Sequence, residues 1–283
     1  MTGFPIFIVY GPEHVAHLKT LTIPSINRQL GQDAIDIYLL NYSSKTPLFG
    51  PQDSHGLCTI HDLSADKSTI TNGFGEGMNF LFEKAQPSPC FLMLNPDTIL
   101  DPHAVETLLR HFDPTSSGLI EARQWPSEHP KEYDKMSGET PWASGACLLA
   151  ASDNYAAIGG FDPVYFMYCE DVDLSWQSWL RGRSVIYVPK AGVMHFTGLF
   201  HYRHDRYYRE HFYSCRNHIV LAKKFFGITG EKKALEHLRI SGYPEGFKEQ
   251  VIKSYESIAP SVIIIDRPDH PMVKITGFNR YHH

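Results

Sequence analysis

Short apolar runs rich in branched and aromatic residues alternate with segments of helical period along this chain. The runs predict buried strands at 5–10, 34–42, 57–63, 90–100, 118–123, 142–151 and 184–189. Helical spacing occurs at 13–30, where Pro24 is expected to kink or break the helix, and at 101–112. This alternation predicts a mostly parallel α/β sheet, in which ligands bind at the carboxyl ends of the strands.

Composition and charge narrow the class of protein. The chain has 283 residues, of which 42% are hydrophobic and 20% charged, so it can build a sizeable core as one large domain or one domain with an appendage. The net charge of −5 offers no basic face, so we expect no nucleic-acid partner.

The cysteines and the first residues predict a cytoplasmic protein. The five cysteines are scattered and form no CxxC pair, which argues against a disulfide framework and a cysteine zinc site. The segment 1–14 has no basic region before its short apolar run, so it does not read as a signal peptide. No stretch approaches the ~20 apolar residues of a membrane span.

Two polar segments follow predicted strands. In LNPDT (94–98), the Asp97 carboxylate at a strand end could hold a hard divalent cation, or it could cap the next helix in a turn. In NGFGEGMN (72–79), glycines could let the backbone approach a phosphate, although the segment matches neither the P-loop nor the dinucleotide fingerprint and a plain turn fits equally well.

The stretch FMYCEDVDLSW (166–176) places Glu170, Asp171 and Asp173 at the start of a predicted helix. Acids in the first turn stabilise a helix, but three exceed what capping requires. Asp171 and Asp173 are two positions apart and point different ways, so we expect one acid to face a site and another to be structural. His195 follows a strand and is either a metal ligand or an ordinary satisfied histidine.

These segments together resemble family 2 glycosyltransferases, most closely the rhamnosyltransferase-like group that builds bacterial surface polysaccharides. That group shows a small-residue SGA strand, GGFD, an F-Y-EDvDL motif and a strand ending in P-A-v-H, and this chain has SGA, GGFD, FMYCEDVDL and PKAGVMH in that order. NGFGEGMN and LNPDT resemble its glycine-rich loop and its variant of the DxD metal motif, and YSCRNHIVLAKKFFG resembles its RN helix. The resemblance spans about residues 5–227.

The resemblance implies a role for each matching residue. Catalysis falls to Asp171, as general base, with Glu170 as its neighbour, although both lie in one turn and either could take the proton. Magnesium or manganese would be bound by Asp97, with His195 completing the shell. The donor pocket would comprise Tyr10, Asn41, Asn72, Gly73, Asn79, Asn95 and Asp97, and the acceptor side Trp142, Ser144 and Gly145. Asp173 would cap its helix and orient the loop.

The resemblance also implies a GT-A fold, a Rossmann-like mixed sheet flanked by helices. The catalytic domain would span 1–200, with a nucleotide-sugar half (1–100) and an acceptor half (101–200), and 201–283 would form a C-terminal helical extension. The expected reaction is inverting, metal-dependent transfer from dTDP-rhamnose or a UDP-hexose to a glycan or lipid-linked acceptor. Two departures weaken the nucleotide half: the first strand lacks the usual Asn, and Leu40 stands where relatives have an Asp.

Several alternatives stay open. A degenerate glycosyltransferase acting as a binding or scaffold subunit would explain the two departures. A nucleotidyltransferase would need a basic glycine-rich loop after the first strand, which GPEHVAH lacks. The tail, with HIVLAKKFFG, would either lie on the inner face of the cytoplasmic membrane or pack on the catalytic domain, and its low charge favours packing. Residues 228–283 would shape the acceptor site or a contact in a homo-oligomer, and the polar segment 124–141 would form a mobile covering loop.

Overall fold

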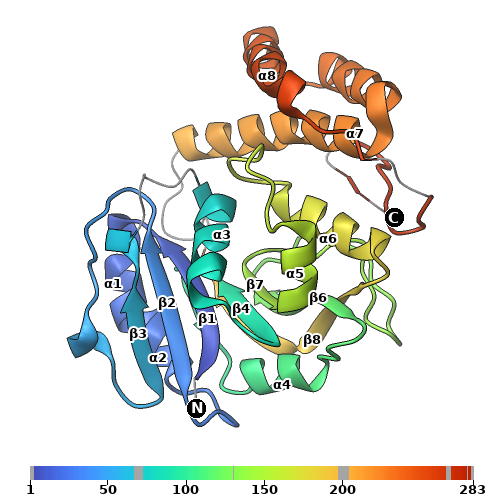
Figure 1. Ribbon diagram of the computed structural model, residues 1–283. Helices are drawn as coiled ribbons and strands as arrows, with labels where there is room; N and C mark the ends of the chain where they lie inside the picture. The colour runs from blue at the N-terminus through green and yellow to red at the C-terminus, as the bar shows by residue number, and fades with distance from the viewer. Residues whose placement is uncertain are drawn as a thin grey trace.

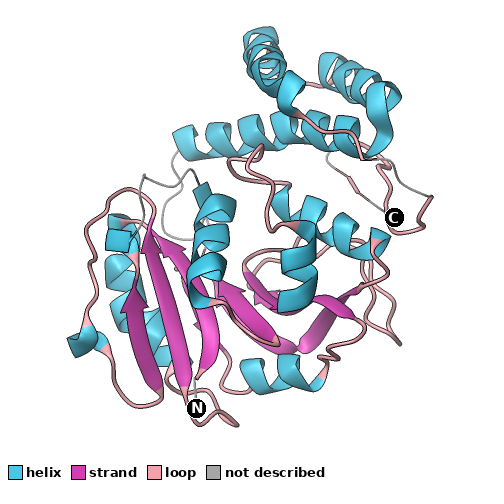
Figure 2. Cartoon of the chain, viewed as in Figure 1, coloured by secondary structure: helices cyan, strands magenta, loops and turns pink. Residues whose placement is uncertain are grey.

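The structure is a computed structural model that describes residues 3–66, 73–129, 131–196, 204–265, 269–278 and 280–281. Its centre is an eight-stranded mixed sheet with the order β3-β2-β1-β4-β7-β6-β8-β5. The strands are β1 (Phe4–Tyr10), β2 (Ile35–Asn41), β3 (Cys58–Asp62), β4 (Cys90–Leu94), β5 (Thr98–Leu100), β6 (Ser117–Trp125), β7 (Cys147–Ala151) and β8 (Ser184–His195). Figure 2 shows how the sheet runs through the molecule.

The first half of the sheet is parallel and the second half is mixed. Strands β3, β2, β1 and β4 run parallel, whereas β7 runs antiparallel to both β4 and β6. Strand β8 lies parallel to β6, and β5 is antiparallel to β8. The predicted strand 90–100 is divided because the turn Asn95–Asp97 sends the chain from β4 to the opposite edge of the sheet, at β5. The predicted mostly parallel α/β sheet is therefore confirmed.

Helices cover both faces of the sheet (Figure 1). They are α1 (Val15–His17), α2 (Ile23–Ile26), α3 (Gly73–Ala85), α4 (Ala104–Arg110), α5 (Ser152–Ile158) and α6 (Glu170–Leu180). One buried cluster joins the sheet to α3, α5 and α6, and a second joins its other face to α1, α2 and α4. The predicted helix 13–30 is broken, because a 3₁₀ turn (Pro12–His14) and a π-helical turn (Leu18–Thr22) interrupt it and Pro24 lies in the first turn of α2.

The predicted C-terminal helices are present as α7 (His204–Ile240) and α8 (Glu245–Ile258), which a 3₁₀ turn (Ala259–Ser261) follows. Gly227 adopts φ +63° and divides α7 into two helices. The expected domain boundary near residue 200 falls on 197–203, outside the described residues. Within the described part of the chain, no helix is long and apolar enough to cross a membrane.

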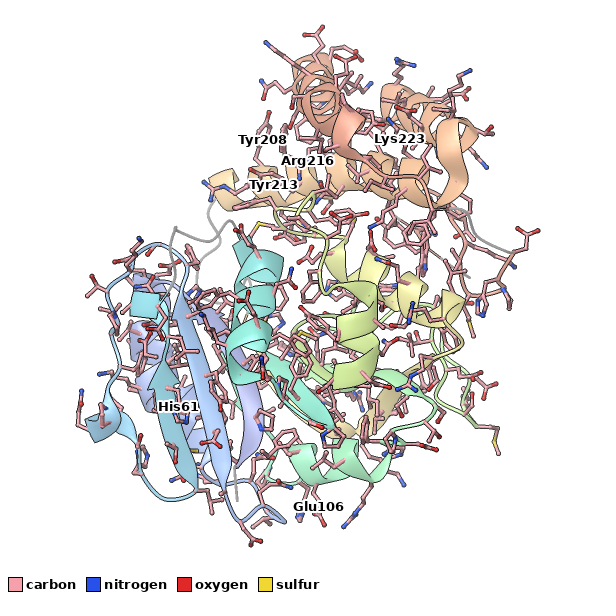
Figure 3. All side chains as sticks on the ribbon, in the orientation of Figure 1. His61, Glu106, Tyr208, Tyr213, Arg216 and Lys223 are labelled. Atoms are coloured by element: carbon pink, nitrogen blue, oxygen red, sulfur yellow. The ribbon has the colours of Figure 1, made fainter. Side chains whose placement is uncertain are left out.

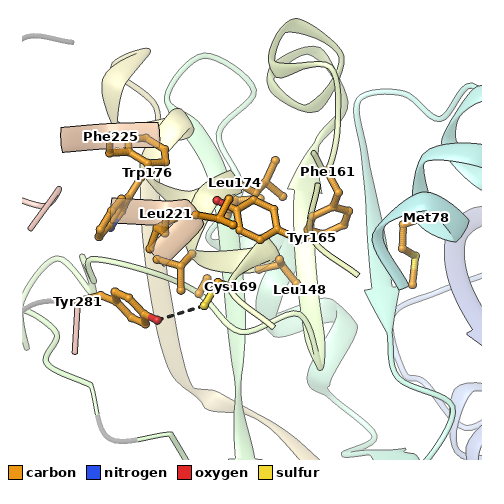
Figure 4. Packing of buried hydrophobic residues seen from close by; sticks show 14 of the residues in the cluster. Met78, Leu148, Phe161, Tyr165, Cys169, Leu174, Trp176, Leu221, Phe225 and Tyr281 are labelled. Atoms are coloured by element: carbon orange, nitrogen blue, oxygen red, sulfur yellow. Dashed lines mark hydrogen bonds between the residues drawn. The ribbon is translucent and has the colours of Figure 1, made fainter. Parts of the chain in front are cut away.

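The first part of α7 packs on α6 rather than standing apart from the sheet and its helices. The ring of Trp176 on α6 meets Phe225 of α7 at 5.0 Å between centroids, edge to face. Figure 4 shows these rings beside Leu221 and Tyr281 in one continuous apolar cluster. Tyr213, Arg216 and Lys223 lie along the same helix (Figure 3). Packing is therefore the arrangement that the structure supports for this part of the tail.

Candidate active site

Asp97 and His195 meet where β4, β5 and β8 approach one another. Asp97 lies in the turn that follows β4, and His195 is the last residue of β8. Because β5 pairs with β8 and Thr98 stands opposite His195, the Asp97 Oδ1 atom lies 3.4 Å from His195 Nε2. Burial acts to raise the pKa of Asp97, but the hydrogen bond and charge of His195 outweigh it and hold that pKa below its usual value.

Neighbouring amides set the orientation of the His195 ring. His195 Nδ1 lies 3.0 Å from Gln124 Oε1, and an amide oxygen only accepts hydrogen bonds, so Nδ1 is the donor. The other ring nitrogen, Nε2, lies 3.1 Å from Asn95 Nδ2 and faces Asp97. A histidine that binds a metal usually donates its second ring N–H to such a partner. Gln124 in turn donates to Glu121 Oε1 at 3.4 Å.

The Asp97–His195 pair fits two positions of a divalent-cation shell. One carboxylate oxygen and one imidazole nitrogen lie 3.4 Å apart, and both side chains are mostly buried. Among the described residues, no three His, Cys, Asp or Glu side chains gather closely enough to hold a metal ion by themselves. A cation here would therefore take further oxygen ligands from a substrate or water, as magnesium and manganese commonly do.

The acids of the EDVD motif occupy the first turn of α6. Asp171 accepts hydrogen bonds from the Gly145 N–H at 3.3 Å and from the Val172 N–H at 2.9 Å. Burial raises the pKa of Asp171, and burial together with the neighbouring Asp171 charge raises the pKa of Glu170. Glu170 Oε2 is buried and has no hydrogen-bond partner among the residues that the structure describes. These two carboxyl groups therefore differ from ordinary surface acids, as groups that accept protons in enzymes often do.

Asp173 has a different role from the expected cap. Its side chain is 2% exposed, and its Oδ2 atom lies 2.6 Å from Lys224 Nζ on α7. The same ammonium group contacts Asp162 Oδ2 at 2.6 Å. The prediction that Asp173 caps α6 is wrong, because the carboxylate points away from the backbone N–H groups and toward this buried cation. The expectation of one structural acid in the motif is confirmed.

Of the residues expected on the acceptor side, Gly145 and its neighbour Ala146 connect these two groups. Asn95 N–H donates to the Ala146 carbonyl at 2.9 Å, and the Gly145 N–H donates to Asp171. The segment 145–146 therefore contacts both the Asp97 turn and the first turn of α6. Ser144 is buried, and its hydroxyl accepts from the Ala146 N–H at 3.4 Å.

Sequence reasoning missed a buried ion pair beside Trp142. Lys131 Nζ contacts Glu121 Oε2, and the two side chains are 6% and 2% exposed. The same ammonium lies 4.2 Å from the centroid of the Trp142 ring, and its charge partly offsets the raised pKa of Asp171. Lys131 belongs to the segment 124–141, which carried no motif. Since Glu121 also accepts from Gln124, a chain of contacts runs from Lys131 to His195.

Some of the expected donor residues use their side chains inside the protein. Asn79 Oδ1 accepts from Tyr155 and Phe161, and its Nδ2 donates to the Phe161 carbonyl at 2.8 Å. Asn41 Oδ1 accepts from both the N–H and the hydroxyl of Ser43. These two amides hold loops, and donor contact by either side chain stays a prediction.

The other residues expected in the donor pocket have different surroundings. Gly73 adopts φ +87°, and a Cβ there would lie 2.1 Å from the Phe166 carbonyl oxygen, so only glycine fits. Asn72 lies outside the described residues. Leu40, at the position expected to hold an Asp, is fully buried in the cluster under α3. A missed acid, Asp62 at the end of β3, accepts from the Leu48 and Phe49 N–H groups at 3.0 and 3.2 Å.

Tyr10 is fully buried, and its hydroxyl donates to Asp62. The hydroxyl is thus engaged inside the protein, and the expected donor contact of Tyr10 stays a prediction. We expect Tyr10→Phe to lower the free energy of unfolding by about 1.5–3 kcal/mol, because a hydrogen bond to a charged group is lost. Urea denaturation checks the stability. An unchanged urea midpoint in Tyr10→Phe would contradict the stabilising role of this hydroxyl. A changed donor KM with unchanged stability would contradict it as well.

Part of this sequence is similar to known rhamnosyltransferases. No protein-family model matches the chain. The N-acetylglucosaminyl-diphospho-decaprenol L-rhamnosyltransferase of Mycobacterium tuberculosis is 39% identical over 93 residues, which are 33% of this chain and 27% of that protein. Rhamnosyltransferase WbbL of Escherichia coli K12 is 35% identical over 68 residues, 24% of this chain and 26% of that protein. The matches thus span about a quarter of each relative.

Solved structures match nearly the whole chain at low sequence identity. GalNAc-T7 with UDP, GalNAc and Mn²⁺ has a TM-score of 0.60 and 14% identity, over 93% of this chain and 57% of that one. The mannosyltransferase PcManGT of Pyrobaculum calidifontis, with GDP-Man and Mn²⁺, has a TM-score of 0.55 and 11% identity, over 92% and 81%. The chain therefore has the GT-A fold of glycosyltransferases, and over 33% of its length its sequence is similar to a rhamnosyltransferase.

Proposed function

We propose that this protein is an inverting, metal-dependent glycosyltransferase of bacterial surface polysaccharide synthesis. One observation carries the proposal. The Asp97 turn and the Asp171 carboxylate, from motifs more than seventy positions apart, contact adjacent residues of the same backbone, Ala146 and Gly145. A site for leaving-group charge and a site for proton removal thus lie on either side of one short segment.

Single displacement at a sugar carbon needs these two functions. Asp171, with its raised pKa, accepts the proton of the acceptor hydroxyl as the oxygen bonds to the anomeric carbon. The bond from that carbon to the nucleoside diphosphate breaks on the opposite side, so the configuration inverts. Asp97 and His195 would hold a magnesium or manganese ion, which neutralises charge on the departing diphosphate. No covalent enzyme intermediate is required.

Substrate classes follow from the relatives rather than from the site. The similarity to a rhamnosyltransferase whose name specifies a decaprenol-linked acceptor supports dTDP-rhamnose as donor and a lipid-linked glycan as acceptor. A UDP-hexose is the alternative donor, because the structurally similar protein TarS of S. aureus was solved in complex with UDP-GlcNAc. If the acceptor is lipid-linked, the protein would transfer the sugar at the cytoplasmic face of a membrane.

A binding or scaffold subunit is the competing proposal. The observation behind it is Leu40, whose buried apolar side chain stands where the family resemblance leads us to expect a donor-binding Asp. Metal-dependent hydrolysis or transfer of a nucleotide-sugar separates the two proposals, because a scaffold should catalyse neither reaction.

Thermal denaturation with nucleotide-sugars tests donor binding. We expect dTDP- or UDP-sugars to raise the melting temperature only when manganese is present, since a ligand at 100 times its Kd stabilises by ~2.7 kcal/mol. Asp97→Asn should abolish the metal-dependent part of this rise, whereas Asp33→Asn at an exposed position should preserve it. No rise with any nucleotide-sugar, or an equal rise in Asp97→Asn, would refute the assignment of Asp97.

A further inference from the structure

The backbone immediately before the EDVD acids has an uncommon conformation. Tyr168 and Cys169 both adopt φ +69°, in the left-handed region that non-glycine residues rarely occupy. Glu170, the first residue of α6, follows directly. Two such residues in succession persist only where the surrounding structure holds them, and they concentrate at functional sites.

Asn217 on α7 holds this turn from one side. Its side chain is fully buried, and its Nδ2 atom donates to the carbonyl oxygens of Met167 and Tyr168, each at 2.7 Å. Its Oδ1 atom accepts from Arg216 Nε at 2.8 Å. Both amide hydrogens of Asn217 are therefore used on the two carbonyls that precede Cys169.

Tyr281 holds the turn from a second segment of the chain. Its hydroxyl lies 3.1 Å from Cys169 Sγ, the contact drawn as a dashed line in Figure 4. Its ring packs against Trp176 and His218, at 5.9 and 5.8 Å between centroids. Tyr281 is 8% exposed, so the contact with Cys169 is formed in a mostly water-free environment.

The orientation of the Asp171 carboxylate depends on the left-handed turn at Tyr168 and Cys169. Asp171 lies two residues after Cys169 and reaches the Gly145 N–H only through a 3.3 Å hydrogen bond. A change in the backbone dihedrals at Tyr168 or Cys169 would rotate the first turn of α6 and move the Asp171 carboxylate away from that N–H group. The described contacts to the turn from Asn217 and Tyr281 both come from the C-terminal extension.

We propose that Asn217 and Tyr281 are positioning residues, which lock the left-handed turn at 168–169 and thereby aim Asp171 at the acceptor. The inference rests on the proposed function for its catalytic consequence. It makes the C-terminal extension a part of the active-site architecture, because residues of that extension determine where the general base points.

Two variants test the proposal in the full-length chain. We expect Asn217→Ala to lower kcat at least tenfold while the donor KM stays within twofold, since the hydrogen bonds of Asn217 go to Met167, Tyr168 and Arg216 rather than to an expected donor residue. Tyr281→Phe keeps the ring but removes the hydroxyl, and should lower kcat about threefold. Asn154→Ala is the matched control, because Asn154 is equally buried but donates to Ser178, away from the turn. Its kcat should equal that of the wild type.

A combined variant distinguishes positioning from general destabilisation. If Asn217 acts through Asp171, then adding Asn217→Ala to Asp171→Asn should lower the residual rate by less than twofold. A further tenfold loss in that background, or an unchanged kcat in folded Asn217→Ala, overturns the proposal.

Hydrogen exchange provides a measurement that does not depend on activity. Amides of residues 165–172 should exchange at least tenfold faster in Asn217→Ala than in the wild type or in Asn154→Ala. Equal exchange in all three proteins overturns the proposal. If the wild type transfers no sugar but the turn exchanges faster in Asn217→Ala, the proposed function fails while the locking of the turn stands.

Discussion

Replacing Asp171 with Asn should reduce the rate of sugar transfer at saturating substrates by about 10²–10⁴-fold, the usual contribution of a positioned general base. Asparagine keeps the shape of the side chain, so its oxygen can still accept from the Gly145 N–H. What is lost is the ability to take the acceptor proton. Donor binding, measured by the manganese-dependent thermal shift, should be unchanged.

Glu170→Gln is the matched control for that experiment, because the two acids are adjacent and both have raised pKa values. We expect it to lower kcat by less than tenfold. If Glu170→Gln has the larger effect and Asp171→Asn the smaller one, the two roles are exchanged. Transfer that survives in both variants at the wild-type rate would remove the EDVD motif from the chemistry.

The raised pKa values of Glu170 and Asp171 predict how kcat depends on pH. A base must be deprotonated to act, and burial raises the pKa of Asp171 above the ordinary value of ~3.9. The kcat should therefore rise with pH through an apparent pKa above that value, and the rise belongs to the Glu170–Asp171 pair rather than to either acid alone. Because the folded-state pKa values are raised, these groups favour the folded state at low pH, and that contribution is lost as the pH increases through them.

Replacing Lys224 with Met should destabilise the protein by about 3–5 kcal/mol, the usual effect of breaking a buried ion pair from one side. Lys224 is 6% exposed at its side chain and contacts both Asp173 and Asp162 at 2.6 Å. Without the cation, the 2% exposed Asp173 side chain must be protonated or stay unpaired in the core. Urea denaturation measures the loss.

The controls for Lys224 separate burial from pairing. Arg110→Ala removes a surface ion pair between Arg110 and Glu106, whose side chains are 68% and 28% exposed, and should leave the urea midpoint unchanged. Lys224→Met combined with Asp173→Leu should recover part of the loss, because the unpaired carboxylate in the core is then gone. A Lys224→Met protein as stable as the wild type would show that the pair contributes nothing to the link between α6 and α7.

Local patterns predicted much of the fold. Apolar runs such as 5–10 and 184–189 are strands in the structure, because a strand buried on both faces needs a continuous run of apolar residues. The break of 90–100 at Asn95–Pro96–Asp97 could have been expected from Pro96, which cannot donate in a sheet. That β5 then pairs with β8 at the far edge depends on a tertiary contact that no window of sequence contains.

The candidate site, like the fold, has features that local sequence predicts and features that depend on tertiary contacts. The motifs identified Asp97, Asp171 and His195, because a carboxylate at a strand end or a helix start is a local feature. The meeting of Asp97 with His195, and the contact of Asp171 with Gly145, depend on strand order and on the start of α6.

By itself, the sequence determined the alternation of strands and helices and supplied the residue types that can perform the proposed chemistry. Only the tertiary structure decided which of these side chains face a site. Asp173 turned to Lys224, Tyr10 to Asp62 and Asn79 to Phe161, because each buried polar group must find a partner and the partners lie far away along the chain. Those pairings depend on how the elements pack in space, which neighbouring residues in the sequence cannot specify.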